Sequence, residues 1–165
     1  MARTLYWWLT AKMQVETVRD YTFQIRAGYY SAVDKAIRKT VIDIVADTQQ
    51  AIIANDTIDT GALLASVYAS THGSSGHSAA ASEASAAASR SGKKSGRPHK
   101  FEMLPEEPVG PLEGITTVGA EYAVNVELGT FRASPQPSFI PASERGIASF
   151  EKATVDMINR EVPNR

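Results

Sequence analysis

Residues 121–142, EYAVNVELGTFRASPQPSFIPA, decide the fold. The first half of this stretch alternates apolar and polar residues, which is typical of an antiparallel strand with one buried face, and a Gly-Thr pair ends the alternation. Pro135 and Pro137 then stiffen a corner, and Pro141 suits the first turn of a helix, where its missing N–H is not needed. The sequence therefore predicts a strand, a rigid corner and a helix start in direct succession.

Two amphipathic helices are predicted on either side of this stretch. Residues 29–55 repeat apolar side chains at spacings of three and four, which marks one face of a long helix starting at Gly28 or Ser31. That face consists of Val33, Ile37, Val41, Ile44, Thr48 and Ile52. A second helix follows Ala142 and frays near Pro163, with an apolar face made of Ile147, Phe150, Thr154, Met157 and Ile158.

Further strands are expected around Val67 and over residues 115–122. Residues 1–28 are rich in β-branched and aromatic residues, so we predict two short strands or an arm that docks on a neighbouring protein. Trp7 and Trp8 would face opposite sides of a strand, which makes them candidates for partner contact. The alternative is that this aromatic pair caps the core of its own domain.

Residues 72–100 form a low-complexity segment dominated by serine, alanine and glycine. It offers no large apolar side chain to offset its ordering entropy, so we expect it to be mobile unless a partner holds it. Its alanine-rich centre, residues 79–88, would form a helix only when docked against something. The segment is too long for an ordinary connection and is therefore interpreted as an insertion.

These elements predict an α+β fold, in which a long N-terminal helix and a C-terminal helix pack on a mainly antiparallel sheet. The low-complexity insertion lies between the strands. The predicted organisation is an N-terminal arm or pair of strands (1–28), a single α+β domain (29–71 and 101–165) and the insertion loop (72–100).

Composition limits the classes of function. The chain has 165 residues, 43% of them hydrophobic, a net charge of −1 and no cysteine, which excludes disulfides and thiolate chemistry. The apolar run at residues 5–9 is far too short to span a bilayer and lacks a signal-peptide layout. We expect a protein made in the cytoplasm and not inserted in a membrane.

No catalytic, metal-binding or cofactor-binding residues are predicted, and the chain is not expected to be an enzyme. His72, His77 and His99 lie in or beside the low-complexity segment, where no rigid shell would orient them. The sequence contains neither a Gly-x-Ser-x-Gly elbow nor a glycine-rich phosphate loop. Glu121 and Glu127 would share one face of a strand, but a solvated or intersubunit salt bridge explains them better than acid–base work.

Nucleic-acid binding is a more specific alternative to catalysis. Residues 72–100 carry five basic residues against Glu83, a segment charge of +4, which leaves −5 on the rest of the chain. A flexible basic loop on an acidic body can reach phosphates in a salt-dependent way. The candidate contacts for DNA or a partner are Arg90, Lys93, Lys94, Arg97 and Lys100.

Three short elements, taken in order, resemble the neck or tail-completion family of long-tailed bacteriophages, which are small head–tail joining proteins. The family's (V/I)-D-T-G-x-L-x-x-S element is matched by residues 58–66, and its Y-A-x-x-V-E-(F/L)-G-T element by residues 122–130. Its closing element, which ends in proline and alanine, is approximated by residues 137–142; the family usually has proline directly before phenylalanine, whereas Ser138 separates Pro137 from Phe139 here. The motif residues are Asp59, Thr60, Gly61, Leu63, Ser66, Tyr122, Ala123, Val126, Glu127, Gly129, Thr130, Pro137, Phe139, Pro141 and Ala142.

The resemblance implies a structural virion protein without a cofactor, in which copies of the chain form a ring, with six-fold symmetry expected. Such a ring joins the DNA-filled head to the tail and encloses the DNA channel without reading its sequence. The implied partners are the connector or stopper proteins and the tail tube or terminator, with assembly in the host cytoplasm. Two alternatives remain open: a tail terminator that caps tube polymerisation, and a DNA-binding module acting through residues 90–100.

Overall fold

The computed structural model describes residues 2–56, 61–95, 103–106 and 108–162, with side chains from residue 23 onward and, in the second range, up to residue 90. The elements run, in chain order, α1 (Ala2–Ala54), α2 (Ala62–Ala65), β1 (Val67–Thr71), β2 (Ser74–Ser75), α3 (His77–Ser95), β3 (Gly114–Val118), α4 (Ala123–Leu128) and α5 (Phe139–Glu161). The mixture of long helices with a small antiparallel sheet confirms the predicted α+β class.

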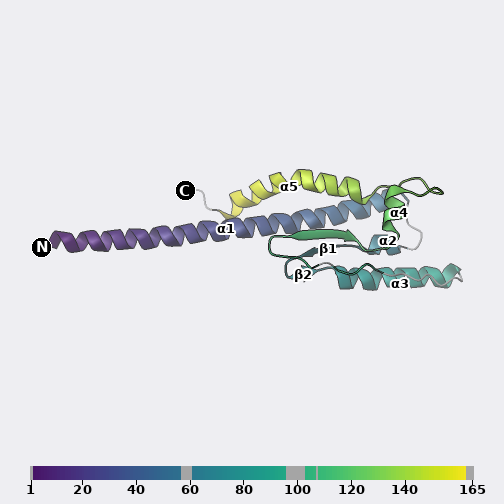
Figure 1. The fold of residues 1–165 in the computed structure, drawn as a ribbon, viewed down its shortest axis with the longest axis horizontal. Helices are drawn as coiled ribbons and strands as arrows, with labels where there is room; N and C mark the ends of the chain where they lie inside the picture. The colour runs from purple at the N-terminus through teal and green to yellow at the C-terminus, as the bar shows by residue number, and fades with distance from the viewer. Residues whose placement is uncertain (1, 57–60, 96–102, 107, 163–165) are drawn as a thin grey trace.

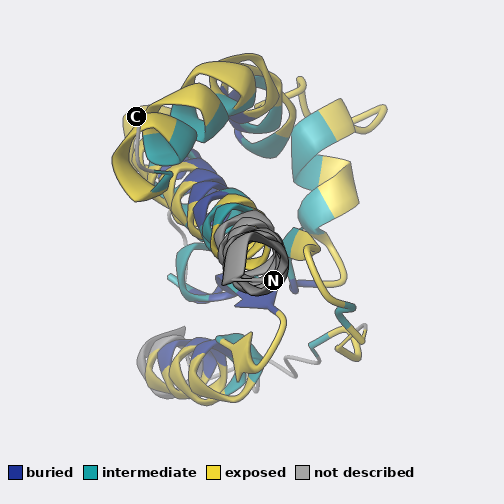
Figure 2. Ribbon diagram, turned by 90° about the vertical axis from the view of Figure 1, so that its left-hand side faces the viewer, coloured by how far each residue is buried: buried dark blue, intermediate teal, exposed yellow. Residues whose placement is uncertain are grey.

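The elements form layers in the order α5, α1, sheet and α3, and α4 stands to one side of them (Figures 1 and 2). The sheet has the order β2-β1-β3, and β1 pairs antiparallel with both neighbours. Val67 lies opposite Val118 and Thr71 opposite Gly114. The predicted strands around Val67 and after residue 114 are thereby confirmed, although the second ends at Val118.

Helix α1 confirms the helix predicted over residues 29–55 and extends it to Ala2. The expected face points inward, because Val41, Ile44, Thr48 and Ile52 are buried and the two earlier members are half-buried. The predicted start was wrong. Gly28 lies inside the helix, where a Cβ would come within 3.3 Å of the Glu161 carbonyl oxygen, so its small size serves the contact with α5 rather than a helix end.

The strands predicted within residues 1–28 were also wrong, because α1 continues through them and projects beyond the sheet and α5 (Figure 1). Apolar and polar residues alternate over a few positions of this segment, as in a strand. However, residues 1–28 contain no proline that would interrupt a helix. Trp7 and Trp8 lie on this projecting part, and their side chains are outside the described set.

Helix α5 runs alongside α1 (Figure 1), and small residues allow the close approach. Ala142 and Gly146 are buried, and a Cβ on Gly146 would stand 2.2 Å from a side-chain carbon of Ile44. Ile147, predicted for the apolar face, is instead 70% exposed. An ion pair of 2.7 Å between Lys35 and Glu161 closes the far end of the helix pair.

Residues 77–95 were expected to be mobile without a partner, and they form helix α3 instead. The helix docks on α2 and β1 of its own chain, so the condition set for the alanine-rich centre is met within the molecule. Its buried side turns toward the body (Figure 2) and consists of Ala80, Ala84, Ala87 and Ala88. Alanine has the highest helix propensity and lets two backbones come close, which compensates for the lack of large apolar groups.

The strand predicted over residues 122–128 is the largest correction, since Ala123–Leu128 form helix α4. Ala123 and Val126, three residues apart, pack against the core cluster of Ile52, Leu63, Val67 and Ala120. This spacing fits a helix. Val124 and Leu128, which the strand pattern would bury, are each 63% exposed.

Candidate assembly site

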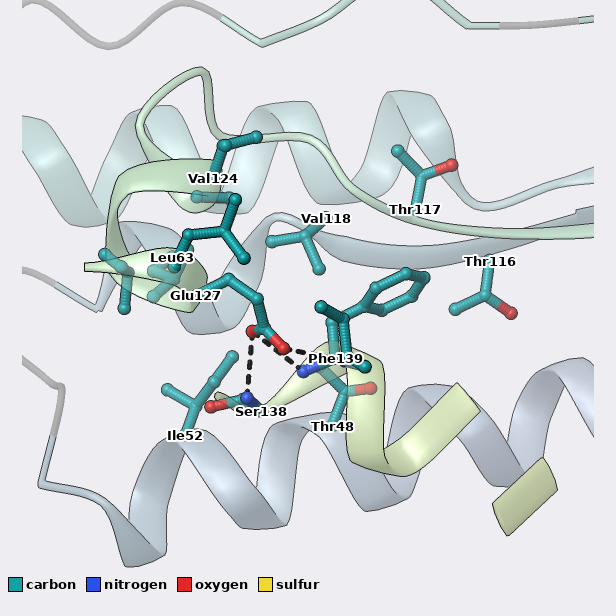
Figure 3. Close-up of a pocket in the computed structure, with 14 residues that line it drawn as sticks. Thr48, Ile52, Leu63, Thr116, Thr117, Val118, Val124, Glu127, Ser138 and Phe139 are labelled. Carbon is teal, nitrogen blue, oxygen red and sulfur yellow. Dashed lines mark hydrogen bonds between the residues drawn. The ribbon is translucent and has the colours of Figure 1, made fainter. Parts of the chain in front are cut away.

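An apolar cavity of about 330 Å³ lies between α1, the sheet, α4 and the start of α5 (Figure 3). Its inner wall is formed by Ile52, Leu63 and Val118. The Thr48 hydroxyl donates to the Ile44 carbonyl oxygen at 2.7 Å, so this buried polar group is satisfied within its own helix. A space lined in this way suits an apolar occupant.

The side chain of Glu127 joins α4 to α5. Its two carboxylate oxygens accept the backbone N–H groups of Ser138 (2.8 Å), Phe139 (3.1 Å) and Ile140 (2.7 Å), and Figure 3 shows the carboxylate pointing at this helix end. These three donors have no partner within the helix, and the positive end of the helix dipole favours a carboxylate there. A helix cap contributes about 0.5–2 kcal/mol in total, and a charged acceptor raises this to about 2–3 kcal/mol.

Glu127 is therefore a helix cap. The predicted pairing with Glu121 on one strand face was wrong, because Glu127 belongs to α4 and Glu121 precedes it. Since Glu127 is bonded to its own chain, it is also not the solvated or intersubunit salt bridge that the sequence suggested.

The turn between α4 and α5 is built from the same motif. Gly129 has φ of +75° and ψ of 177°, a conformation open essentially to glycine alone, and a Cβ there would lie 2.7 Å from the Pro135 nitrogen. Thr130 and Ala133 exchange backbone hydrogen bonds of 2.9 and 3.3 Å, and the Thr130 hydroxyl accepts the Arg132 N–H and shares the Ala133 N–H with the Thr130 carbonyl oxygen. Gln136 returns the chain to α4 by donating to the Val126 carbonyl oxygen. We call residues 122–142, from α4 to the first turn of α5, the corner.

The described part of the first motif element, residues 61–66, lies next to the corner. Gly61 adopts φ of +77°, as predicted for a turn glycine, and precedes α2. The buried Ser66 hydroxyl donates to the Leu63 carbonyl oxygen and accepts the Ala120 N–H. Asn55 reaches the corner from the end of α1 by donating to the Pro137 carbonyl oxygen. Residues 59 and 60 of the motif, Asp59 and Thr60, lie outside the described residues.

Pro141 stands in the first turn of α5, as predicted, and Ala142 is buried behind it. The motif residues that the structure describes thus have packing, turn or capping roles and converge on one region. Tyr122 opens α4 from its N-cap position. Phe139 lines the cavity from α5.

The basic candidates that the structure describes lie on α3, in the layer farthest from α5 (Figure 1). Arg90 is exposed on α3, Lys93 and Lys94 lie on the same helix without described side chains, and Arg97 and Lys100 are outside the described residues. The structure does not bring the described part of this set to the corner (Figures 1 and 2).

A polar cluster at the β1–β2 hairpin was missed from the sequence. Glu106 accepts the Ser70 hydroxyl at 3.0 Å, and Ser70 lies 3.2 Å from the Ser75 hydroxyl. Hydrogen bonds from Ser75 and Ser70, together with the charge of His77, lower the pKa of Glu106 below its ordinary value. The repeated serines of the low-complexity segment gave no signal that two of them meet a distant carboxylate.

His77 was interpreted as a linker residue, but it begins α3 and has defined contacts. Its ring packs edge-on against Tyr68 at 5.4 Å between centroids, and Nε2 lies 3.1 Å from the Leu104 carbonyl oxygen. A carbonyl oxygen only accepts, so Nε2 carries the proton and holds the chain around the hairpin. His72 is exposed and His99 is outside the described residues.

Within the described residues, no group of three or more acidic or histidine side chains is arranged to hold a metal ion. No helix in that part of the chain is long and apolar enough to cross a membrane. Comparison with family models, curated proteins and solved structures found no match to this chain.

Proposed function

We propose that the chain is a structural virion protein of the bacteriophage neck, whose copies form a ring that joins the DNA-filled head to the tail. The main support is the corner. The motif elements on which the family resemblance rests meet there, because Ala123 and Val126 pack against the core cluster that contains Leu63, and Glu127 caps the start of α5. The side chains of Ser66 and Glu127 both bond to the backbone of their own chain, which supports a role of these motif residues in shape.

The exposed surface of the corner also supports an assembly role. Val124, Leu128 and Phe131 are 63%, 63% and 92% exposed, and they follow one another within a single rigid unit. An isolated exposed apolar side chain is ordinary, but several on one rigid unit mark a surface that another protein covers. The proposed places for this assembly are the host cytoplasm during tail joining and the neck of the finished virion.

Electron microscopy tests this function in two steps. The purified protein is expected to form closed rings, and their symmetry gives the copy number. Phage particles made without the protein are expected to show full heads beside unattached tails of normal length. Overlong tails would instead assign the terminator role. A protein that stays monomeric at all concentrations and is absent from virions would contradict both assembly roles.

A gel-shift titration tests the DNA-binding alternative. A ring through which the genome passes does not need to bind DNA phosphates tightly. We therefore expect the protein not to change the mobility of double-stranded DNA at low salt. Binding that weakens steeply with salt, and that a change of Arg90, Lys93 and Lys94 to glutamine abolishes, would favour the DNA-binding module.

A further inference from the structure

The turn at residues 130–133 carries Phe131, the large apolar side chain with the greatest exposure, 92%, among the described residues. In Figure 1 the loop that follows α4 extends beyond the end of the sheet. The bonds between Thr130 and Ala133 and the tight packing of Gly129 on Pro135 fix this turn. An aromatic side chain held outward on a rigid turn loses little conformational freedom on binding.

The same chain offers an apolar receptor. The cavity of about 330 Å³ exceeds the roughly 150 Å³ that suffices for an apolar cavity to bind benzene, so it has room for a phenyl ring. The exposed side chains of Val124, Leu128 and Ile140 line it. Since Phe131 is almost fully exposed in its own chain, it does not fill its own cavity.

Charge is complementary between the two surfaces. The guanidinium of Arg132 lies 4.8 Å from the centroid of the Phe131 ring, so the turn presents an aromatic ring together with a positive charge. On the receptor side, Ile140, Glu144 and Ile147 follow at helical spacings of four and three and share one exposed face of α5. Among the described residues Glu144 has no ion-pair partner, so a carboxylate is available one helical turn from the cavity.

We propose that Phe131 of one copy inserts into the apolar cavity of the next copy, with Arg132 placed against Glu144 at its edge. This inference rests on the proposed ring and identifies the contact that builds it. A protruding group and a receptor at different places on one chain make a head-to-tail interface, which produces a ring when the rotation closes. The same contact can also be made reciprocally in a twofold dimer, with each Phe131 in the cavity of the other copy, and association then stops at two chains.

Cysteine cross-linking tests the contact directly, because the chain has no cysteine of its own. Two differently tagged chains, one Phe131→Cys and the other Val124→Cys, are co-expressed in full length and gently oxidised. We expect a disulfide between the two tagged chains. In the matched control, Ile42→Cys replaces Val124→Cys. Ile42 is 62% exposed against 63% for Val124 but lies on α1 outside the cavity, so we expect at least about tenfold less cross-linking.

A chain that carries both Phe131→Cys and Val124→Cys sharpens the result. Head-to-tail contact predicts a ladder of covalent species that stops at the copy number of the ring, seen on non-reducing gels. A ladder that stops at two chains, or dominant pairing of Phe131→Cys with itself, would show a twofold interface and overturn the inference. Native mass spectrometry that finds a small apolar molecule in the cavity, with no cross-link, would overturn it as well.

A second variant measures the strength of the contact. Phe131→Ser removes the aromatic ring from an exposed position, so folding by circular dichroism is expected to be unchanged while association weakens at least about tenfold. Ile42→Ser is the control and is expected to assemble normally. Closed rings without the cross-link would reject this contact and leave the proposed function standing. Chains that never associate would reject both.

Discussion

Helix α3 and the corner use apolar surface in opposite ways. Helix α3 buries only alanines, Ala80, Ala84, Ala87 and Ala88, against its own chain, whereas the corner leaves Val124, Leu128 and Phe131 exposed. The low-complexity helix thus completes the monomer. The corner, which carries most of the motif residues, leaves large apolar groups exposed, and we propose that they make contacts outside the monomer. The number of large apolar side chains in a region therefore does not indicate whether that region buries them within its own chain.

The largest effect is expected from a charge placed under α3. Ala84 is fully buried, so Ala84→Glu forces a carboxylate into the interface with α2 and β1 and is expected to lower the free energy of unfolding by about 4 kcal/mol. Urea denaturation followed by circular dichroism measures it. The control is Ala86→Glu on the exposed side of the same helix, for which less than about 0.5 kcal/mol is expected. Equal effects would show that α3 does not dock as described.

Removing the cap of α5 comes next. Glu127→Ala leaves three backbone N–H groups at the start of the helix without their acceptor, and we expect a loss of about 2–3 kcal/mol. Glu121→Ala is the matched control, since Glu121 is exposed just before α4, and its effect should stay within about 0.5 kcal/mol. Chemical denaturation compares the two variants. A neutral Glu127→Ala variant would contradict the capping role.

The sequence predicted the elements that have a long period or a specific turn residue. The spacing of apolar residues alone predicted the buried face of α1 from Val41 to Ile52, because a long helix repeats this spacing several times. The positive φ at Gly61 and the place of Pro141 in the first turn of α5 followed from the restricted conformations of these residue types.

The failures came where tertiary contacts outweigh the local pattern. Helix α4 spans six residues, which is too short for a period of 2 to be told from 3.6, and the packing of Ala123 and Val126 on the core decides between them. Helix α3 was predicted only on condition that its alanine-rich centre docks, because its stability comes from contacts with α2 and β1 that its own composition does not reveal. The roles of Glu127 and Glu106 depend on partners that are distant in sequence or in another element.

A smaller difference in stability is expected between glycine substitutions in the corner and in the β1–β2 hairpin. Gly129 and Gly73 both have positive φ, of +75° and +76°, but only Gly129 is crowded, with the Pro135 nitrogen 2.7 Å from the position of a Cβ. We expect Gly129→Ala to lower the free energy of unfolding by about 2 kcal/mol and Gly73→Ala by about 1 kcal/mol, the cost of the left-handed backbone alone. Thermal denaturation of both variants gives the difference. Equal losses would mean that the turn has room to relax.

The smallest effect is a pH dependence confined to the hairpin on the α3 side. The hydroxyls of Ser75 and Ser70 and the charge of His77 lower the pKa of Glu106 from its ordinary value of 4.5. Because the folded state has the lower pKa, these bonds stabilise the hairpin above the pKa of the unfolded chain, and the stabilisation is lost as the pH falls through the folded value. Once corrected for the intrinsic effect of pH on exchange, the protection of the β1 and β2 amides should therefore fall on acidification.

Glu106→Gln tests that pH dependence, since glutamine still accepts a hydrogen bond but does not titrate. In this variant the exchange rates in β1 and β2, corrected for the intrinsic effect of pH, are expected to stay constant between about pH 3 and pH 6. The amides of the corner serve as an internal control, because Glu106 makes no described contact there. If the hairpin of the variant still opened on acidification, another group would be responsible for its pH dependence.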